Sequence, residues 1–193
     1  MHANVHAGVS QGVAMAPPTT INASEFHSVT GKLVRVPDPD RLVHLQFRRF
    51  AGCPICNLHL RSFVARHDEL ERASIREVVF FHSPADELAR HTADLPFATV
   101  GDPDKVVYRR FGVEQGARAL LDPRSWPSIV RGVALTTAGR FRTPSLRQPG
   151  GRLGLPADFL IAPDGTVAAA KYGRHADDQW SVDEVLHHAA QLG

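Results

Sequence analysis

The stretch LVHLQFRRFAGCPICNLHL (residues 42–60) joins an apolar, strand-like segment to a cysteine pair and then to a helical pattern. Cys53 and Cys56 are the two cysteines of the chain, and two residues separate them. Proline is tolerated at the first position of a helix, where its missing N–H would have no partner. The stretch therefore predicts a strand that leads to a helix capped by Cys53, with Pro54 at the first helical position.

A cysteine at a helix start is favoured as a thiolate. Unpaired N–H groups and the positive end of the helix dipole can lower a thiol pKa from about 8.5 into the range of roughly 3.5 to 7.5. Cys56, one turn further on, is placed to attack a bond formed at Cys53. Arg48 and Arg49 can add positive potential, but consecutive side chains of a strand point to opposite faces, so only one of them can face the pair. We expect a redox pair.

Two other interpretations of the pair stay open. Free cysteine is a common buried side chain, so Cys53 and Cys56 can also be inert core thiols. Zinc requires four ligands, usually including a second matched pair, and none follows in the sequence; His59 extends the spacing but spreads the ligands too widely around a helix. Asn57 follows Cys56, so the C-x-x-C-H pattern of covalent haem attachment is absent. We therefore expect no metal and no cofactor.

The composition is that of an ordinary globular protein. The chain has 193 residues, 43% apolar residues and a net charge of +2, which indicates one domain with a sizeable core. Two cysteines do not form a secreted disulfide framework. No apolar run is long enough to span a membrane, and the first residues lack a signal-peptide pattern. We expect a cytoplasmic protein without a membrane partner.

Strands alternate with helices along the rest of the chain. Residues 1–24 read as a mobile arm, and a domain follows over residues 25–193. Apolar patterning predicts two strands across a polar turn (32–36 and 41–47), further strands (76–81 and 97–100) and a hairpin (157–162 with 166–172). Helices are predicted over 56–70, from Ser83, from Asp102, over 128–139 and from the capping-box pattern SVDE at 181–184. This order indicates a mixed α/β sheet covered on both faces.

Residues 117–154 form an arginine-rich insertion. This segment contains seven arginines and a single acidic residue, Asp122. Aromatic residues are not interleaved with the arginines as in a nucleic-acid surface, so we expect a solvated loop and no nucleic-acid partner.

Four blocks between Leu42 and Leu186 resemble the peroxiredoxin-like branch of the alkyl hydroperoxide reductase and thiol-specific antioxidant group. They are LVHLQFRRFAGCPIC, VVFFHSPADELARHTADLPFATVGDP, VVYRRFGV and LGLPADFLIAPDGTVAAAKYG. The resemblance implies a thioredoxin-like fold with a central mixed sheet, helices on both faces and an N-terminal β-hairpin extension. It also implies that Pro156 is a cis-proline that faces the cysteine pair and shapes the substrate groove.

The chain departs from the pattern of that group at the site itself. Its members carry Pro-x-x-x-Thr-x-x-Cys, which places Arg49, Cys53 and Cys56 at the three defining positions. Members also have a supporting arginine where this chain has Pro156. The resemblance thus leaves open which cysteine attacks first, whereas the helix-end argument favours Cys53.

Together these observations predict a peroxiredoxin-like thiol–disulfide oxidoreductase. Cys53 is the expected nucleophile and Cys56 the resolving thiol. The substrate is a peroxide or a protein disulfide, and the reductant is a thiol such as a thioredoxin or glutathione system. A homodimer remains open. The alternative is a redox sensor or partner-binding protein that does not turn over and uses the pair as a switch.

Overall fold

A five-stranded mixed sheet lies at the centre of the computed structural model, which describes residues 17–113, 122–145, 148 and 150–192. The strands are β3 (Leu42–Arg48), β4 (Ile75–Phe81), β5 (Ala98–Gly101), β6 (Ala157–Ile161) and β7 (Val167–Tyr172). Their order is β5-β4-β3-β6-β7. Strands β3, β4 and β5 run parallel, β6 runs antiparallel to β3, and β7 antiparallel to β6. The central strand β3 is buried at all but its first residue, as expected for a strand covered on both faces.

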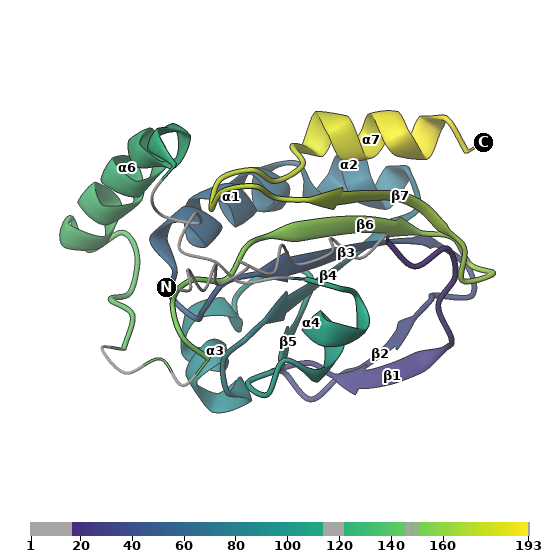
Figure 1. Cartoon of the computed structure of the whole chain (residues 1–193), viewed down its shortest axis with the longest axis horizontal. Coiled ribbons are helices and arrows are strands. Elements are labelled where there is room, and N and C mark those ends of the chain that lie inside the picture. Colours follow the sequence, from purple (N-terminus) through teal and green to yellow (C-terminus); the bar gives the residue numbers. More distant parts are fainter. Residues whose placement is uncertain (1–16, 114–121, 146–147, 149, 193) are drawn as a thin grey trace, which may run out of the picture.

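Helices and a hairpin cover the two faces of this sheet. The helices are α1 (Pro54–Ala65), α2 (His67–Arg72), α3 (Ala85–Thr92), α4 (Val106–Arg110), α6 (Trp126–Thr137) and α7 (Val182–Ala190), with a short 3₁₀ turn, η1 (Pro123–Ser125). Side chains of α1, α2, α3 and α7 join one apolar core, whereas those of α4 and the hairpin join a second core on the other face. Figure 1 shows α1, α2 and α7 together on one side and α4 with the hairpin on the other. The predicted fold class is confirmed.

The N-terminal hairpin is confirmed, but its strands differ from those expected. Strand β2 (Leu33–Val36) pairs with β1 (Ser24–His27), which the sequence analysis did not recognise, and not with residues 41–47. The reason is that both edges of β3 are already occupied, one by β4 and the other by β6. The hairpin is therefore a separate two-stranded sheet.

Part of the predicted N-terminal arm contacts the domain. Residues 1–16 lie outside the described residues. Further on, Val167 N donates to Thr19 O and Ile21 N donates to Gly165 O, both at 2.9 Å. The chain is therefore attached to the β6–β7 turn ahead of residue 24.

Several helix starts follow the predicted chemistry. Cys53 is the N-cap residue of α1, with Pro54 in its first turn, and Ser181 and Glu184 form the expected capping box of α7. Asp102 accepts from the N–H groups of Val106 and Val107 at 2.9 and 2.8 Å, although the N-cap position itself is taken by another residue.

Two helices differ from the expected ones. The predicted helix over 56–70 is divided at Arg66 into α1 and α2. Helix α3 begins after Pro84, its N-cap residue, and the Ser83 hydroxyl instead accepts from the backbone of Ala51 at 2.9 Å. Ser83 thus fixes the loop ahead of Cys53 rather than a helix.

The arginine-rich insertion contributes a helix that lies on the start of α1. Its predicted helix is present as α6, whereas residues 114–121, 146–147 and 149 lie outside the described part. A Cβ on Gly132 would lie 2.8 Å from Pro54 Cβ and 3.0 Å from Pro54 O, so only glycine permits this approach. Helix α6 therefore covers the turn that carries the cysteines.

Within the described residues, no helix has both the length and the apolar content needed to cross a bilayer.

Candidate active site

A backbone hydrogen bond from the end of the neighbouring strand β4 fixes the loop between β3 and α1. His82, directly after β4, donates its N–H to Arg49 O at 3.1 Å. Gly52 adopts a φ of +74°, a conformation that residues with a side chain rarely adopt, and the chain then turns so that Cys53 N donates to Phe50 O at 3.0 Å. Cys53 is thereby placed at the carboxyl edge of the parallel strands, where ligands commonly bind in such sheets.

The two cysteines are brought together at the first turn of α1. Both are free thiols, and both are buried, with 0% and 1% exposure. Burial raises the pKa of Cys53, but the Cys56 thiol as donor, the Arg49 charge and the N–H groups of Cys56 and Ile55 outweigh it and lower this pKa to about 6. Burial and the adjacent Cys53 sulfur raise the pKa of Cys56 well above its usual range. These opposite pKa shifts favour the thiolate on Cys53 and the proton on Cys56.

Arg49 is the cation that faces this thiolate. Its Nη1 lies 3.7 Å from Cys53 Sγ, and its Nη2 donates to Arg152 O. The Arg48 guanidinium instead donates to Asp158 Oδ1 at 2.6 Å, so the expectation that only one of the two arginines faces the pair is confirmed. The sequence analysis did not include Arg49 among the site residues. The period-two argument shows that one of the pair must face the cysteines but not which one.

A buried histidine lies behind Arg49. A Cβ on Gly154 would meet His82 Nε2 at 2.7 Å and Arg49 Cγ at 3.7 Å, and a Cβ on Gly150 would meet His82 Nδ1 at 2.6 Å. Neither ring nitrogen of His82 has a hydrogen-bond partner among the described residues. Burial and the nearby cations lower the pKa of His82 to about 4, so the ring is neutral at pH 7. The glycine loop therefore packs directly on an imidazole that makes no side-chain hydrogen bond.

Pro156 lies at the same edge of the sheet, but its backbone differs from the expectation. The cis peptide bond found in the described residues joins Val36 to Pro37, so the Leu155–Pro156 bond is trans and the expected cis-proline is wrong. Pro156 O accepts from Gly173 N at 2.8 Å, and the ring is in such close contact with Gly173 that a Cβ there would lie 2.6 Å from Pro156 Cγ. In this chain the proline directly precedes β6 in trans, where its missing N–H costs little.

An apolar cavity of about 300 Å³ adjoins the start of α1. It is lined by Arg49, Phe50, Pro54, Ile55, Ile129, Val133, Thr136, Thr137, Pro144 and Arg152. Arg49 and Pro54 line this cavity and also adjoin Cys53, so the cavity lies next to the residues that surround the thiol.

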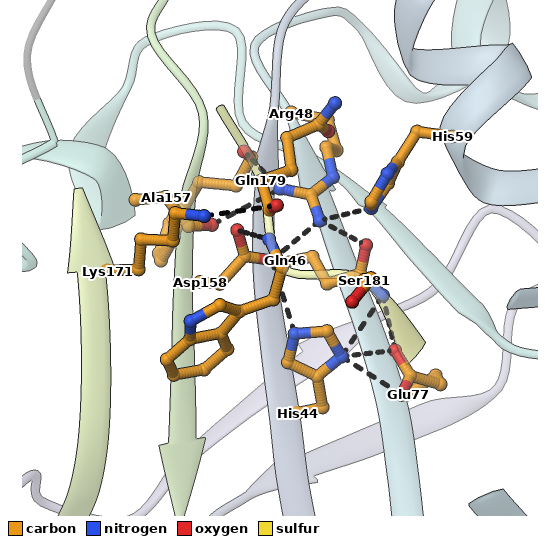
Figure 2. A network of polar contacts seen from close by, with 12 residues as sticks. His44, Gln46, Arg48, His59, Glu77, Ala157, Asp158, Lys171, Gln179 and Ser181 are labelled. Atoms are coloured by element: carbon orange, nitrogen blue, oxygen red, sulfur yellow. Dashed lines mark hydrogen bonds and ion pairs between the residues drawn. The ribbon is translucent and has the colours of Figure 1, made fainter. Parts of the chain in front are cut away.

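A network of buried charges surrounds Arg48 (Figure 2). Arg48 Nη2 donates to Asp158 Oδ1 at 2.6 Å and lies 3.2 Å from His59 Nε2. His44 pairs with Glu77 at 2.8 Å and with Asp158 at 3.2 Å. The network connects β3, β4, β6 and α1, so it fixes the strand and the helix that carry Arg49 and Cys53.

The charged groups of this network shift one another's pKa values. Burial lowers the pKa of His44, but Glu77 and Asp158 outweigh it and raise this pKa to about 9. Burial raises the pKa of Asp158, but Arg48 and His44 outweigh it and hold this pKa well below its usual range. Burial and the charge of Arg48 lower the pKa of His59 well below its usual range, so that ring is neutral. Two cations thus face two carboxylates.

Within the described residues, no group of three or more His, Cys, Asp and Glu side chains is arranged to hold a metal ion.

Solved structures with this fold include proteins of two redox classes. Peroxidoxin BcpB of Mycobacterium tuberculosis is 19% identical, with 93% of this chain and 99% of that chain covered and a TM-score of 0.65. PrxQ of Xylella fastidiosa is 13% identical, with 94% and 99% covered and a TM-score of 0.63. A proposed thiol:disulfide interchange protein DsbE of Chlorobium tepidum is 15% identical, with 92% and 97% covered and a TM-score of 0.55. These likenesses show a shared thioredoxin-like, peroxiredoxin-like fold.

Sequence comparison identifies the family. No curated protein matches the chain. The model of the family described as AhpC/TSA antioxidant enzyme matches residues 62–175, more than half of the chain, beginning six residues after Cys56. The protein therefore belongs to the AhpC/TSA antioxidant enzyme family and is a thiol-dependent oxidoreductase.

Proposed function

We propose that this protein reduces organic hydroperoxides, with Cys53 as the attacking thiolate and Cys56 as the resolving thiol. The observation that carries the proposal is the arrangement around Cys53 Sγ. This sulfur lies at a helix start, 3.7 Å from Arg49 Nη1, and its pKa is lowered to about 6, whereas the pKa of Cys56 is raised. A thiolate next to a protonated thiol supports Cys53 as the attacking residue and Cys56 as the resolving residue.

The proposed cycle balances in three steps. The Cys53 thiolate attacks one peroxide oxygen, the O–O bond breaks, and the other oxygen leaves as an alkoxide that takes a proton to give the alcohol. The Cys56 sulfur attacks the resulting sulfenic acid, which forms the Cys53–Cys56 disulfide and releases water. A thiol reductant then returns two electrons and two protons. Arg49 is the cation placed to stabilise charge that develops on the leaving oxygen.

Three features favour a small peroxide over a protein disulfide as the oxidant. The cysteines are 0% and 1% exposed, so a bulky disulfide cannot reach either sulfur without rearrangement. The Leu155–Pro156 bond is trans, which removes the main reason for preferring disulfide exchange. The cavity beside Arg49 is lined largely by apolar side chains, which suits an alkyl group. Alkyl peroxide reduction is also the activity named for the bacterioferritin comigratory protein of Xanthomonas campestris, which is 15% identical with a TM-score of 0.59.

Pro156 has a supporting role in this proposal. Through its packing on Gly173 it shapes the edge of the site at the start of β6, and it makes no chemical contribution.

The deciding experiment compares turnover with cumene hydroperoxide, hydrogen peroxide and a protein disulfide, with dithiothreitol as the common reductant. We expect the organic hydroperoxide to be reduced fastest. If the protein disulfide were reduced fastest, the proposed substrate would be wrong and the protein would be a disulfide reductase. A single stoichiometric oxidation of the thiols without turnover would support the redox sensor instead.

Single-cysteine variants test the assignment of roles. We expect the Cys56→Ser protein to accumulate a sulfenic acid or a mixed disulfide at Cys53, and the Cys53→Ser protein to be inert. Mass spectrometry of the trapped adducts reads this out. Adducts that form at Cys56 in the Cys53→Ser protein would exchange the two roles.

A further inference from the structure

A second, larger cavity is also lined by residues of α1 and α6. Its volume is about 660 Å³, which is within the range of small-molecule sites. It is lined by Asn57, Leu60 and Arg61 of α1, by Ala89, Arg90, His91, Ala93, Asp94 and Leu95 in and after α3, and by Thr136, Gly139, Arg140, Phe141, Arg142 and Thr143 in and after α6. Thr136 also lines the apolar cavity, so the two cavities flank the same end of α6.

This cavity carries an excess of positive charge. Four of the lining side chains are arginines, and the one acid among them is Asp94. Arg90 pairs with Glu87 at 3.2 Å, and Arg61 lies over the Phe141 ring at 5.9 Å. Within the described part of the chain, no carboxylate pairs with Arg61, Arg140 or Arg142. Guanidinium groups without a carboxylate partner favour a carboxylate ligand, which they can bind in a bidentate manner.

The wall of the cavity reaches the residues that flank the cysteine pair. Asn57 directly follows Cys56. The His91 side chain is 5% exposed, and its Nδ1 has no partner among the described residues. A Cβ on Gly52, the residue before Cys53, would lie 2.7 Å from His91 Cε1 and 3.0 Å from His91 Nδ1. A ligand held by the arginines therefore lies next to the turn that carries Cys53 and Cys56.

We propose that this cavity binds the carboxylates of a small anionic thiol, and that this thiol is the reductant of the oxidised pair. The inference rests on the proposed function. The thiolate of the bound molecule attacks the Cys53–Cys56 disulfide, forms a mixed disulfide and releases one cysteine as a thiolate. A second molecule of the thiol cleaves the mixed disulfide, so that two thiols leave as one small disulfide and the protein regains its dithiol.

Binding is tested apart from turnover with the Cys53→Ser protein, which cannot react. The probe is S-methylglutathione, which carries two carboxylates and no free thiol, and calorimetry measures its affinity. We expect the Arg61→Gln/Arg142→Gln variant to bind it about tenfold more weakly or worse, because each charge-assisted contact contributes at that scale. Arg72→Gln, which removes an arginine outside the cavity, should bind it normally.

Two outcomes of this binding experiment would overturn the proposal. One is an unchanged affinity in the double variant. The other is equal binding of the dimethyl ester of the probe or of inorganic phosphate, because the cavity would then not recognise a peptide carboxylate.

Kinetics with the unaltered cysteines test the role as reductant site. In the Arg61→Gln/Arg142→Gln protein we expect the ratio of kcat/KM for glutathione to kcat/KM for uncharged dithiothreitol to fall about tenfold, as the loss of one charged contact implies. An unchanged ratio would overturn this role. If the protein reduces no peroxide with either thiol, the proposed function fails, and the calorimetry still decides whether the cavity binds the anion.

Discussion

Two consecutive buried arginines meet opposite kinds of partner. Arg48 is 0% exposed and lies 2.6 Å from the carboxylate of Asp158, which is ionised at any ordinary pH. Arg49 is 3% exposed, and within the described residues it pairs with no carboxylate; its Nη1 faces Cys53 Sγ. The charge of Arg48 is compensated permanently, whereas that of Arg49 is compensated only while Cys53 is a thiolate. Burial without a carboxylate is therefore the feature that suits Arg49 to the proposed chemistry.

The largest effect on stability is expected from removing Asp158, the permanent partner of Arg48. Asp158→Asn leaves Arg48 and His44 buried with one carboxylate between them, and we expect a loss of about 3–5 kcal/mol in the free energy of unfolding. Urea denaturation measures it. The paired variant Arg48→Met/Asp158→Leu, which removes both charges, should lose less than the single one. An equal or greater loss in the pair would mean that packing rather than charge sets the effect.

Removing Arg49 should affect the thiolate and not the fold. Arg49→Met takes away the cation that faces Cys53, so we expect the pKa of Cys53 to rise and the second-order rate with cumene hydroperoxide to fall about 100-fold at pH 7, the scale of one lost electrostatic contact. Thiolate absorbance and stopped-flow kinetics measure the two effects. Arg49→Lys, which keeps the charge, should recover part of the rate. An unchanged pKa in the methionine variant would separate Arg49 from the thiolate.

His44 of the charged network should make the free energy of unfolding depend on pH. The pKa of His44 is raised from 6.5 to about 9 in the folded protein. Because the folded value is the higher one, the stabilisation is fully present below about pH 6.5 and is lost as the pH rises through about 9, a change on the order of 3 kcal/mol. Unfolding curves between these pH values measure the slope. The His44→Gln protein, which cannot titrate there, should lack this slope, and an identical slope would assign the loss to another group.

The smallest effect on stability is expected at His82, whose ring nitrogens have no hydrogen-bond partner among the described residues. His82→Leu removes no side-chain hydrogen bond, so we expect a change in the free energy of unfolding within about 1 kcal/mol. The matched variant His59→Leu removes the partner of Arg48 and should cost more, about 1–3 kcal/mol. A larger loss at His82 than at His59 would show that the glycine loop depends on the imidazole.

Features encoded within a few residues of one another could be predicted from the sequence. The cap at Cys53 and the capping box of Ser181 and Glu184 depend on local chemistry, and both are present. Features that require distant segments could not be predicted. The pairing of β2 with β1 follows from competition for the edges of β3, and the network joins His44 to residues 33 and 114 positions away. The trans bond at Pro156 was mispredicted because the family pattern, and not this chain's own packing on Gly173, suggested a cis-proline.

The close contact of Gly132 with Pro54 gives this protein a built-in optical reporter. The α6 backbone rests on the first turn of α1 with no side chain between them, so any movement of that turn on formation of the disulfide would be transmitted to α6. Trp126, at the start of α6, is 57% exposed, whereas Trp180, the other tryptophan, is 4% exposed within the core. The emission of the intact protein should therefore follow the redox state of the cysteines through one indole while the other stays constant.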